Sequence, residues 1–319
     1  MKPKTKHRKF TVGVAGTGFM GENHVRVVSL MRGARLGGIF DGDPARAEVI
    51  SIKYNTKCFA SFGELLSEVD AVIIATPTST HYEYASATIG AGKHVFVEKP
   101  LAGNALDGEK LTAMAMEKKI VLTCGFIERF NPAFTIAYSL ISKDRPLIVN
   151  LRRESPLPAR ITDASVVFDM MIHDLDLAIK ISGAPVADFK AKGRKSKTKN
   201  IDIASASILF RNGIIANVGA NRVAAEKVRT LSVECEHSTV KADLLSRTVI
   251  QKFPPDPASP TLEGPKEVSY PVVAADQITL ELKDFFRAIK SGKDPEVTGR
   301  DALASLRLAE EIENKILKR

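Results

Sequence analysis

The sequence predicts an α/β protein: an N-terminal doubly wound domain over residues 10–124, then an α+β domain over residues 125–319 with a large open, mostly antiparallel sheet. Three observations predict this class. An apolar run ends in the glycine-rich Gly16-Thr-Gly-Phe-Met-Gly21, which begins a helical pattern. Apolar runs then alternate with helical patterns as far as Cys124. From about Val186, strand patterns follow one another directly, as in an antiparallel sheet.

The formal charge of +9 is concentrated in two tracts. Residues 2–9 carry five lysines and arginines and residues 190–199 carry six, which leaves 35 basic residues against 37 acidic ones elsewhere. Neither tract has interleaved aromatic side chains, which nucleic-acid sites use for stacking. We therefore expect a basic tail over residues 1–9, a solvated basic loop, and no nucleic-acid partner.

The three cysteines predict no disulfide framework. Cys58, Cys124 and Cys235 have neither metal-ligand nor C-x-x-C spacing, so we expect ordinary reduced core cysteines. No apolar run approaches the roughly 18 residues of a membrane span, and the amino terminus lacks an apolar signal core. The expectation is a cytoplasmic protein with no membrane partner.

The first strand, Phe10–Ala15, leads into a dinucleotide-binding turn. Gly16 permits the tight turn, Gly18 lets the backbone approach a pyrophosphate, and Gly21 lets the helix pack closely. A second strand, Leu36–Phe40, ends at Asp41, where a carboxylate can bind the adenosine ribose 2′-hydroxyl and repel a 2′-phosphate. Asp41 therefore favours NAD, although the nearby Arg46 leaves NADP open.

The strand and helix alternation then repeats. Ser61 and Glu64 have the spacing of a capping box, and the strand Ala71–Ala75 ends in Thr76-Pro77-Thr78 at a crevice edge. His81, at the start of the next helix, is interpreted either as a cofactor contact or as a helix-capping or surface residue.

The run from His94 to Val97 stops at Glu98-Lys99-Pro100. Ligands of open α/β sheets lie at the carboxyl ends of the strands, so this strand would present Lys99 to a ligand. The alternative is a solvated Glu-Lys pair at a strand end. A helix over about 104–118 and a strand over 120–124 follow, and we expect six strands in the completed domain.

The second domain begins with Asn131-Pro132, an N-cap followed by a first-turn proline. A strand over 147–152 and a helix over about 165–182, ended by Gly183, precede the sheet. Asn212-Gly213 predicts a hairpin between strands 203–210 and 214–218. The remaining strands are expected over 229–234, 239–244 and 248–253, and the closing helices over 277–290 and 300–318. An open sheet exposes one face, so we expect a homodimer or homotetramer formed through it.

A polar stripe lies on the helix before that sheet. Asp169, His173 and Asp176 are spaced i, i+4 and i+7 and so share one face of an otherwise apolar helix. The stripe has three interpretations: a buried histidine satisfied by its carboxylates, a metal site, or a general base oriented by Asp169 or Asp176. The nicotinamide site predicted above favours the general base, and we predict no metal.

Taken together, these motifs resemble the Gfo/Idh/MocA family of sugar and cyclitol dehydrogenases over nearly the whole chain. The resemblance rests on Gly16–Gly21 with His24, Ala75–Thr78 with His81, Ala91–Pro100, Asp169 through Asp176, and Glu281–Phe286. Segments 125–133 and 153–161 are similar to those of UDP-N-acetylglucosamine 3-dehydrogenases in particular. The resemblance implies a Rossmann domain and a catalytic group formed by Lys99, Asp169 and His173.

The function implied is NAD(P)-dependent oxidation of a sugar ring hydroxyl, with C3 of a UDP-N-acetylhexosamine as the expected position. His173 would be the base, Asp169 its orienter, and Lys99 the cation on the reacting oxygen. Lys99 and His173 would meet across an interdomain crevice. Dehydrogenation of a free sugar or inositol, and a non-catalytic sugar-sensing regulator, are the alternatives. Arg129 and Asn131 are further substrate candidates; a surface ion pair and an N-cap are their structural alternatives. The expected cofactor contacts are Gly16, Thr17, Gly18, Phe19, Met20, Gly21, Asp41, Ala75, Thr76, Pro77, Thr78, His81, Glu98 and Lys99.

Overall fold

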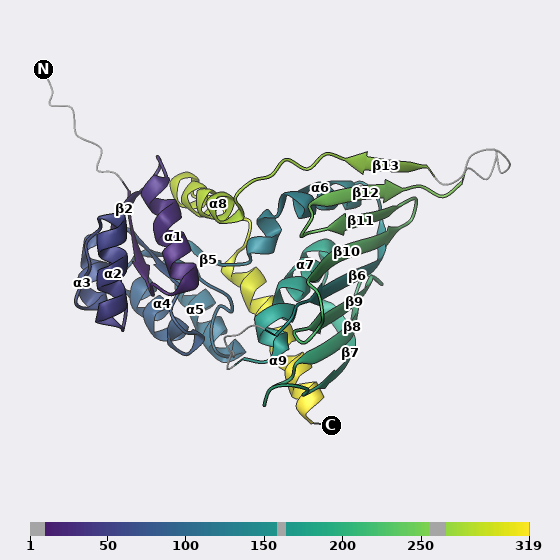
Figure 1. Ribbon diagram of the computed structural model, residues 1–319, viewed down its shortest axis with the longest axis horizontal. Helices are drawn as coiled ribbons and strands as arrows, with labels where there is room; N and C mark the ends of the chain where they lie inside the picture. The colour runs from purple at the N-terminus through teal and green to yellow at the C-terminus, as the bar shows by residue number, and fades with distance from the viewer. Residues whose placement is uncertain (1–9, 158–163, 256–265, 319) are drawn as a thin grey trace, which may run out of the picture. The chain divides into compact units, whose positions relative to one another are not determined.

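The computed structural model describes residues 10–157, 164–255 and 266–318, in two compact units (Figure 1). Unit 1 comprises the chain up to Phe126 together with Ile278–Leu303, and unit 2 comprises Ile127–Gln277 and Ala304–Arg319. Segment 278–303 therefore packs with the first unit, whereas the sequence analysis places it in the second domain. The basic tail and residues 160–161 lie outside the described residues.

Unit 1 is built on a parallel sheet, sheet A, whose strand order is β2-β1-β3-β4-β5. Its strands are apolar on both faces, as expected of a sheet with helices on either side. Every residue of β1, β3 and β4 is buried except His94, which is half-buried. Within the described chain the sheet has five strands, so the prediction of six is wrong; after the fifth the chain turns away into unit 2. The strands are β1 (Thr11–Ala15), β2 (Arg35–Phe40), β3 (Ala71–Ile74), β4 (His94–Val97) and β5 (Leu122–Cys124).

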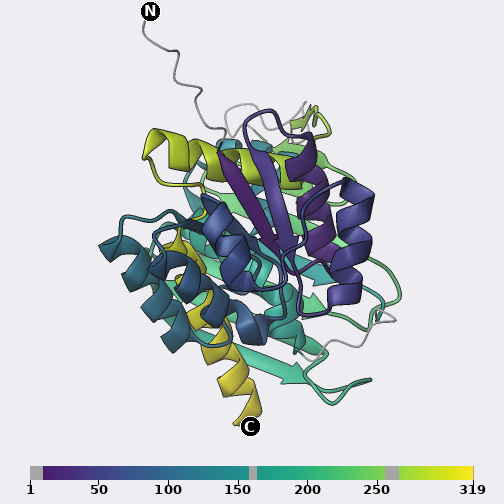
Figure 2. The same ribbon diagram turned by 90° about the vertical axis from the view of Figure 1, so that its left-hand side faces the viewer.

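Several helices of unit 1, which Figure 2 draws mostly in purple and blue, begin at side-chain caps. Ser61 Oγ accepts from the backbone N–H of Glu64, which confirms the predicted N-cap. Glu64 Oε2 accepts from the backbone N–H of Ala60 instead of that of Ser61, so the predicted capping box is formed only in part. Asp43 and Asn104 cap two further helices. The helices are α1 (Phe19–Leu30), α2 (Pro44–Tyr54), α3 (Phe62–Glu68), α4 (His81–Gly90), α5 (Ala105–Glu117) and α8 (Gln277–Ser291).

Unit 2 contains sheet B, ordered β13-β12-β11-β10-β6-β9-β8-β7 and antiparallel except for the pair β6 and β9. The predicted Asn212-Gly213 hairpin is confirmed, with Gly213 at φ +87° where a side chain would be strained. The basic residues 190–194 lie on an exposed strand, so a loop was the wrong prediction for them. The strands are β6 (Pro146–Glu154), β7 (Val186–Arg194), β8 (Ile203–Phe210), β9 (Ile215–Asn221), β10 (Val228–Cys235), β11 (Thr239–Asp243), β12 (Thr248–Lys252) and β13 (Glu267–Tyr270).

The helix predicted over residues 165–182 has two parts. It opens with a π-helical turn, Val167–Met171, and continues as α7 (Ile172–Ser182), ending at Gly183 with φ +63° as predicted. π-helical turns are rare and often occur at functional sites. The other helices of unit 2 are α6 (Pro132–Ile141) and the carboxyl part of α9 (Gly299–Leu317).

Sheet B buries one face only. Along β8 and β9, buried residues alternate with exposed ones, and the helices α6, α7 and α9 lie on the buried side (Figure 1). The open face carries small polar side chains such as Asn150 and Asn217, which are hydrogen-bonded to each other at 3.0 Å. The open, mostly antiparallel sheet of the prediction is therefore confirmed.

Two smaller expectations concern cysteines and membranes. All three cysteines are free thiols, but Cys58 is exposed rather than in the core, because it follows the αL residue Asn55 in the loop before α3. Among the described residues, no helix is both long and apolar enough to cross a bilayer.

Candidate active site

The loops that follow the strands of sheet A gather at one edge, because parallel strands all end on the same side. Backbone hydrogen bonds join neighbouring loops: the N–H of Gly16 donates to Phe40 O, and that of Glu98 to Ile74 O, both at 2.8 Å. The predicted cofactor residues from Gly16 to Lys99 thus come from loops of a single edge. The strand order places the crossover reversal between β1 and β3, where open α/β sheets bind ligands.

The glycine-rich turn has the geometry of a phosphate cradle. Gly16 has φ +87°, and an added Cβ would lie 2.6 Å from the backbone of Ala75. At Gly21, a Cβ would collide with the carbonyl oxygen of Gly16. Gly18, by contrast, faces open space and caps α1 without a side-chain hydrogen bond, so the first-turn N–H groups are available to an anion.

Asp41 follows β2 and is held by the glycine-rich turn. Its Oδ2 accepts hydrogen bonds from the backbone N–H and hydroxyl of Thr17, and its Oδ1 accepts from the N–H of Asp43 at 2.9 Å. Burial raises the pKa of Asp41, but the bonds from Asp43 and Thr17 outweigh burial and hold this pKa below its ordinary value. Arg46 lies 3.8 Å away, so a cation does stand near this carboxylate, as the sequence indicated.

Lys99 is positioned by its two neighbours in the chain. Glu98 Oε1 lies 2.6 Å from Nε2 of His24, which is fully buried beneath it, and Glu98 Oε2 accepts from the N–H of Lys99 at 3.3 Å. Pro100, joined to Lys99 by a cis peptide bond, accepts a hydrogen bond from His81 Nδ1 through its carbonyl at 2.7 Å. Two histidines therefore fix the backbone on either side of the half-buried Lys99.

His81 is neither a surface residue nor a side-chain cap of α4. Its ring is 1% exposed, and Nδ1 and Nε2 lie 2.7 Å and 3.0 Å from the carbonyl oxygens of Pro100 and Thr76. Burial lowers its pKa even though both carbonyls favour the protonated ring. The ring ties the end of β3 to the end of β4, which supports a positioning role rather than direct cofactor contact.

The sequence did not indicate that Glu281 would lie buried near Glu98; the residue was noted only as part of a family motif. Glu281 lies on α8, is 2% exposed, and neither of its carboxylate oxygens has a hydrogen-bond partner in the described structure. Burial, with the nearby Glu98 adding to it, raises the pKa of Glu281 well above the ordinary value. An acidic residue on the apolar face of the amphipathic α8 was the only signal available.

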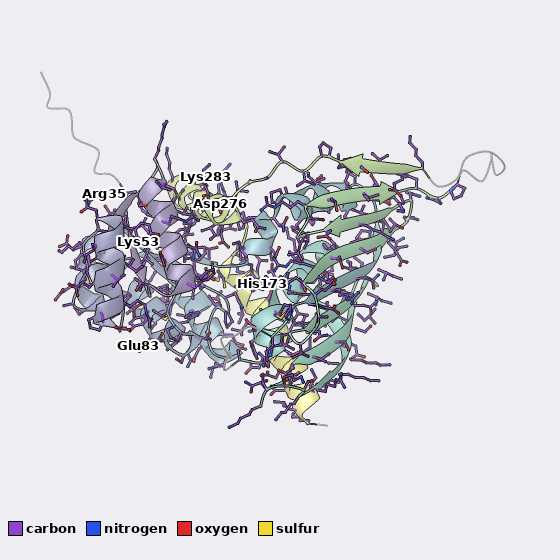
Figure 3. The ribbon with its side chains drawn as sticks, viewed as in Figure 1. Arg35, Lys53, Glu83, His173, Asp276 and Lys283 are labelled. Atoms are coloured by element: carbon purple, nitrogen blue, oxygen red, sulfur yellow. The ribbon has the colours of Figure 1, made fainter. Side chains whose placement is uncertain are left out.

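In unit 2, the predicted polar stripe divides into two environments. Asp169, in the π-helical turn, and His173, one turn later, are half-buried; Figure 3 labels His173. Asp176 is fully buried, and its two oxygens each lie 2.7 Å from the guanidinium of Arg129. Ser305 Oγ adds a third bond to this carboxylate at 3.2 Å. Of the two carboxylates considered as orienters of His173, Asp169 is therefore the better placed.

Arg129 and Asn131 are both committed to protein contacts. Arg129 is 4% exposed and paired with Asp176. Asn131 Oδ1 accepts from the N–H of Ala133, which confirms the N-cap interpretation, and its Nδ2 donates to Glu128 and to Leu244 O. Their placement favours structural roles for both.

Glu128 and Asp174 form a buried network that the sequence did not indicate. Arg153 donates to Asp174 at 2.6 Å and to Glu128 at 3.1 Å, and Arg229 also bonds Glu128. Burial raises the pKa of Glu128, but Arg153 and Arg229 outweigh it and keep this pKa below its ordinary value. Among the residues that the structure describes, no three histidine, cysteine, aspartate or glutamate side chains are placed to hold a metal ion.

Two family models match the chain. Residues 10–126 match the oxidoreductase family with an NAD-binding Rossmann fold, and residues 149–241 match the GFO/IDH/MocA C-terminal domain. A UDP-N-acetylglucosamine 3-dehydrogenase from Acidithiobacillus ferrooxidans is 32% identical over 92% of this chain and 94% of its own length. The chain belongs to the Gfo/Idh/MocA family.

A solved structure of that enzyme and a second relative are similar to this chain over comparable lengths. A solved structure of the Acidithiobacillus ferrooxidans enzyme superposes with a TM-score of 0.90 at 30% identity, covering 96% of this chain and 97% of that one. A myo-inositol 2-dehydrogenase from Thermotoga maritima is 27% identical, covering 93% of each chain. The protein is thus an oxidoreductase with an NAD-binding Rossmann domain.

The residues of unit 1 fit a dinucleotide. Gly18 leaves open space where a phosphate would approach, the amino end of α1 has no side-chain cap, and Asp41 presents a carboxylate at the end of the next strand. This donor and acceptor set has the chemistry that a pyrophosphate and a ribose require.

Proposed function

We propose that this protein oxidises a ring hydroxyl of a sugar with NAD, and that the substrate position is C3 of UDP-N-acetylglucosamine or a related nucleotide sugar. The observation that carries the proposal is the placement of Lys99, held at the carboxyl end of β4 by Glu98 with His24 and by Pro100 with His81. The similarity to a named UDP-N-acetylglucosamine 3-dehydrogenase over 92% of the chain supports the substrate class.

The glycine-rich turn would hold the pyrophosphate of the cofactor, and Asp41 the adenosine ribose. The uncapped N–H groups of α1 would donate to the phosphates, while the Asp41 carboxylate would accept from the ribose hydroxyls and repel a 2′-phosphate. Phe19, Met20 and the Ala75–Thr78 turn would complete the contacts. When bound, NAD accepts the hydride that leaves the carbinol carbon.

The protein's own groups would manage the proton and the charge on oxygen. As the carbinol C–H bond breaks and the C=O bond forms, His173 takes the hydroxyl proton. Asp169 orients the imidazole and stabilises its charged form. Lys99 donates a hydrogen bond to the same oxygen and stabilises the negative charge that develops there.

The second candidate substrate is an inositol or a free sugar. The 27% identity to a myo-inositol 2-dehydrogenase over 93% of both chains supports it. A sugar-sensing regulator is the candidate from outside enzymology, but a binding protein has no use for a proton acceptor and a neighbouring cation held ready in this way.

An activity panel separates these candidates. The purified protein is incubated with NAD and, in parallel, with UDP-N-acetylglucosamine, N-acetylglucosamine and myo-inositol, and NADH formation is followed by its absorbance. We expect turnover with the nucleotide sugar alone, and a 3-keto product by mass spectrometry after borodeuteride trapping. Faster turnover of myo-inositol would establish the second candidate, and NAD binding without turnover of any sugar would indicate the regulator.

We further propose that a second copy of the chain covers the open face of sheet B. Leu209 and Ile215 are directly paired on adjacent strands, 43% and 39% exposed, and Ile148 lies opposite Ile215 on the next strand. Adjacent aliphatic side chains on three strands, two of them exposed and Ile148 half-buried, are typical of an interface. Light scattering should give a dimer or tetramer for the native protein and for Leu106→Glu, whose leucine is exposed in unit 1. Ile215→Glu should give monomer; an unchanged mass would exclude this face.

A further inference from the structure

A cavity within unit 1 lies between α1 and α8, two helices that are labelled in Figure 1. Its volume is about 690 Å³, within the roughly 300–1,000 Å³ usual for small-molecule sites. The walls come from the carboxyl half of α1, the loop after it, Phe10 and one side of α8. Neither the cofactor site nor the reaction proposed above uses this cavity.

The cavity is remote from the glycine-rich turn. Phe10 directly precedes β1 and Gly16 directly follows it, so the two residues lie at opposite ends of this strand. The five residues of the extended strand separate its two ends by about 17 Å. A ligand in this cavity would therefore occupy a site separate from the cofactor.

The floor of the cavity is apolar. The rings of Phe10 and Phe286 meet edge to face with centroids 5.8 Å apart, and Leu30 is left 75% exposed. Exposed apolar surface inside a concavity gains free energy when a ligand covers it. The apolar lining residues are Phe10, Val27, Leu30, Met31, Phe286 and Ile289.

The rim is exclusively basic. Its charged lining residues are Arg26, Arg32, Lys283, Arg287 and Lys290, and no carboxylate of the described part of the chain lines the cavity. Asp284, just outside it, pairs with Arg287 at 2.7 Å. Within the described ranges, the other four cations have no ion pair. Lys283 is labelled in Figure 3 on α8.

Helix dipoles do not account for this rim. Cations often stabilise the last turn of a helix, but only Lys290 lies in such a turn here. Arg26 lies before the last turn of α1, which has no basic residue, and Lys283 lies near the middle of α8. Cations facing one another across an apolar hollow repel each other unless an anion is present.

We propose that this cavity binds a small amphipathic anion: a molecule with an apolar or aromatic body, which covers the Phe10, Leu30 and Phe286 floor, and a phosphate or carboxylate, which meets Arg26 and Lys283. Charge complementarity and the apolar floor together select this class. Inorganic phosphate alone lacks the body, and an uncharged hydrocarbon lacks the head. The proposal does not depend on the sugar chemistry proposed above.

The test uses the full-length protein with the fluorescent probe 1-anilinonaphthalene-8-sulfonate, in the presence of saturating NAD. We expect saturable binding that dodecyl phosphate, below its micelle concentration, displaces, while dodecanol and inorganic phosphate at the same concentration do not. The double variant Arg26→Gln, Lys283→Gln should bind dodecyl phosphate at least about tenfold more weakly, because it loses two charge-assisted contacts. Arg26 is half-buried and Lys283 exposed, glutamine has a good helix propensity at both sites, and thermal unfolding checks that the fold is retained.

The matched control is Arg35→Gln, which removes one exposed positive charge of unit 1 that does not line the cavity. It should bind dodecyl phosphate as the native protein does. Equal binding by the double variant, or an equal loss in Arg35→Gln, would overturn the proposal. So would sedimentation with anionic phospholipid vesicles, lost in the double variant, without binding of monomeric dodecyl phosphate, because the occupant would then be a membrane surface.

Discussion

Asp41 Oδ2 accepts two hydrogen bonds from Thr17, one from its backbone N–H at 2.6 Å and one from its hydroxyl at 2.7 Å. The carboxylate that would select the cofactor is thereby fixed to the turn that would hold the phosphates. Its lowered pKa keeps it ionised at neutral pH, and an ionised carboxylate can still accept further hydrogen bonds from a ribose.

Asp41→Ala should weaken NAD binding by about tenfold and shift the preference toward NADP, because it removes a charged acceptor and a source of repulsion. Calorimetric titration with both cofactors measures this. Asp43→Asn is the control: it removes a neighbouring charge but retains the oxygen that caps α2, so the preference should not change. If the native protein bound NADP more tightly than NAD, the role given to Asp41 would be wrong.

Lys99→Ala and His173→Ala should each lower turnover by roughly a hundredfold or more, the contribution of a positioned acid or base. Thermal stability should stay near native values in both variants, and so should cofactor affinity in His173→Ala. Steady-state kinetics with the sugar identified in the activity panel, together with NAD titrations, make the comparison. Near-native turnover of either variant would rule out the mechanism, whatever the substrate.

Glu281 should make stability depend on pH. Its pKa is raised in the folded protein, so its contribution is fully present below the ordinary glutamate pKa and is lost as pH rises through the folded value. Relative to Glu281→Gln, the native protein should therefore lose stability with rising pH. Denaturant unfolding at a series of pH values measures the difference, with Glu83→Gln on the surface of α4 as a control (Figure 3). A difference that stays constant with pH would contradict the assignment.

Arg153→Leu should destabilise unit 2 by about 3–5 kcal/mol, because it leaves the buried Asp174 and Glu128 carboxylates without their shared cation. The neighbouring Arg152 is a matched control: it points to the opposite, exposed face and pairs with Glu154. Arg152→Leu should change the unfolding free energy by less than about 1 kcal/mol. Comparable losses in both variants would mean that the buried network does not stabilise unit 2.

Local signals in the sequence were sufficient where a feature depends on a few adjacent residues. The glycine-rich turn, the N-cap at Ser61 and the hairpin at Asn212-Gly213 each need particular backbone angles or a nearby acceptor, which only some residue types supply. The alternating patterns likewise predicted both sheets, since burial on one face or two leaves different periods in the sequence.

The remaining features depend on partners distant in the sequence. Helical spacing placed Asp176 beside His173, but a helical wheel does not reveal that Arg129 binds Asp176 or that a π-helical turn carries Asp169. His81 likewise required knowledge of which carbonyls surround it. The apolar side of α8 predicted burial without indicating which unit would bury it.

The return of segment 278–303 to unit 1 has a consequence for biosynthesis. Phe285 of α8 packs against Phe96 of β4, and the hydroxyl of Thr123 donates to Val297 O at 2.7 Å. The first 126 residues and segment 278–303 therefore share one core. A ribosome releases the residues up to Phe126 first, yet unit 1 stays incomplete until residue 303 of the 319 has been translated. A fragment ending at Phe126 should therefore expose apolar surface and aggregate, which makes this unit a poor module for transplantation by simple truncation.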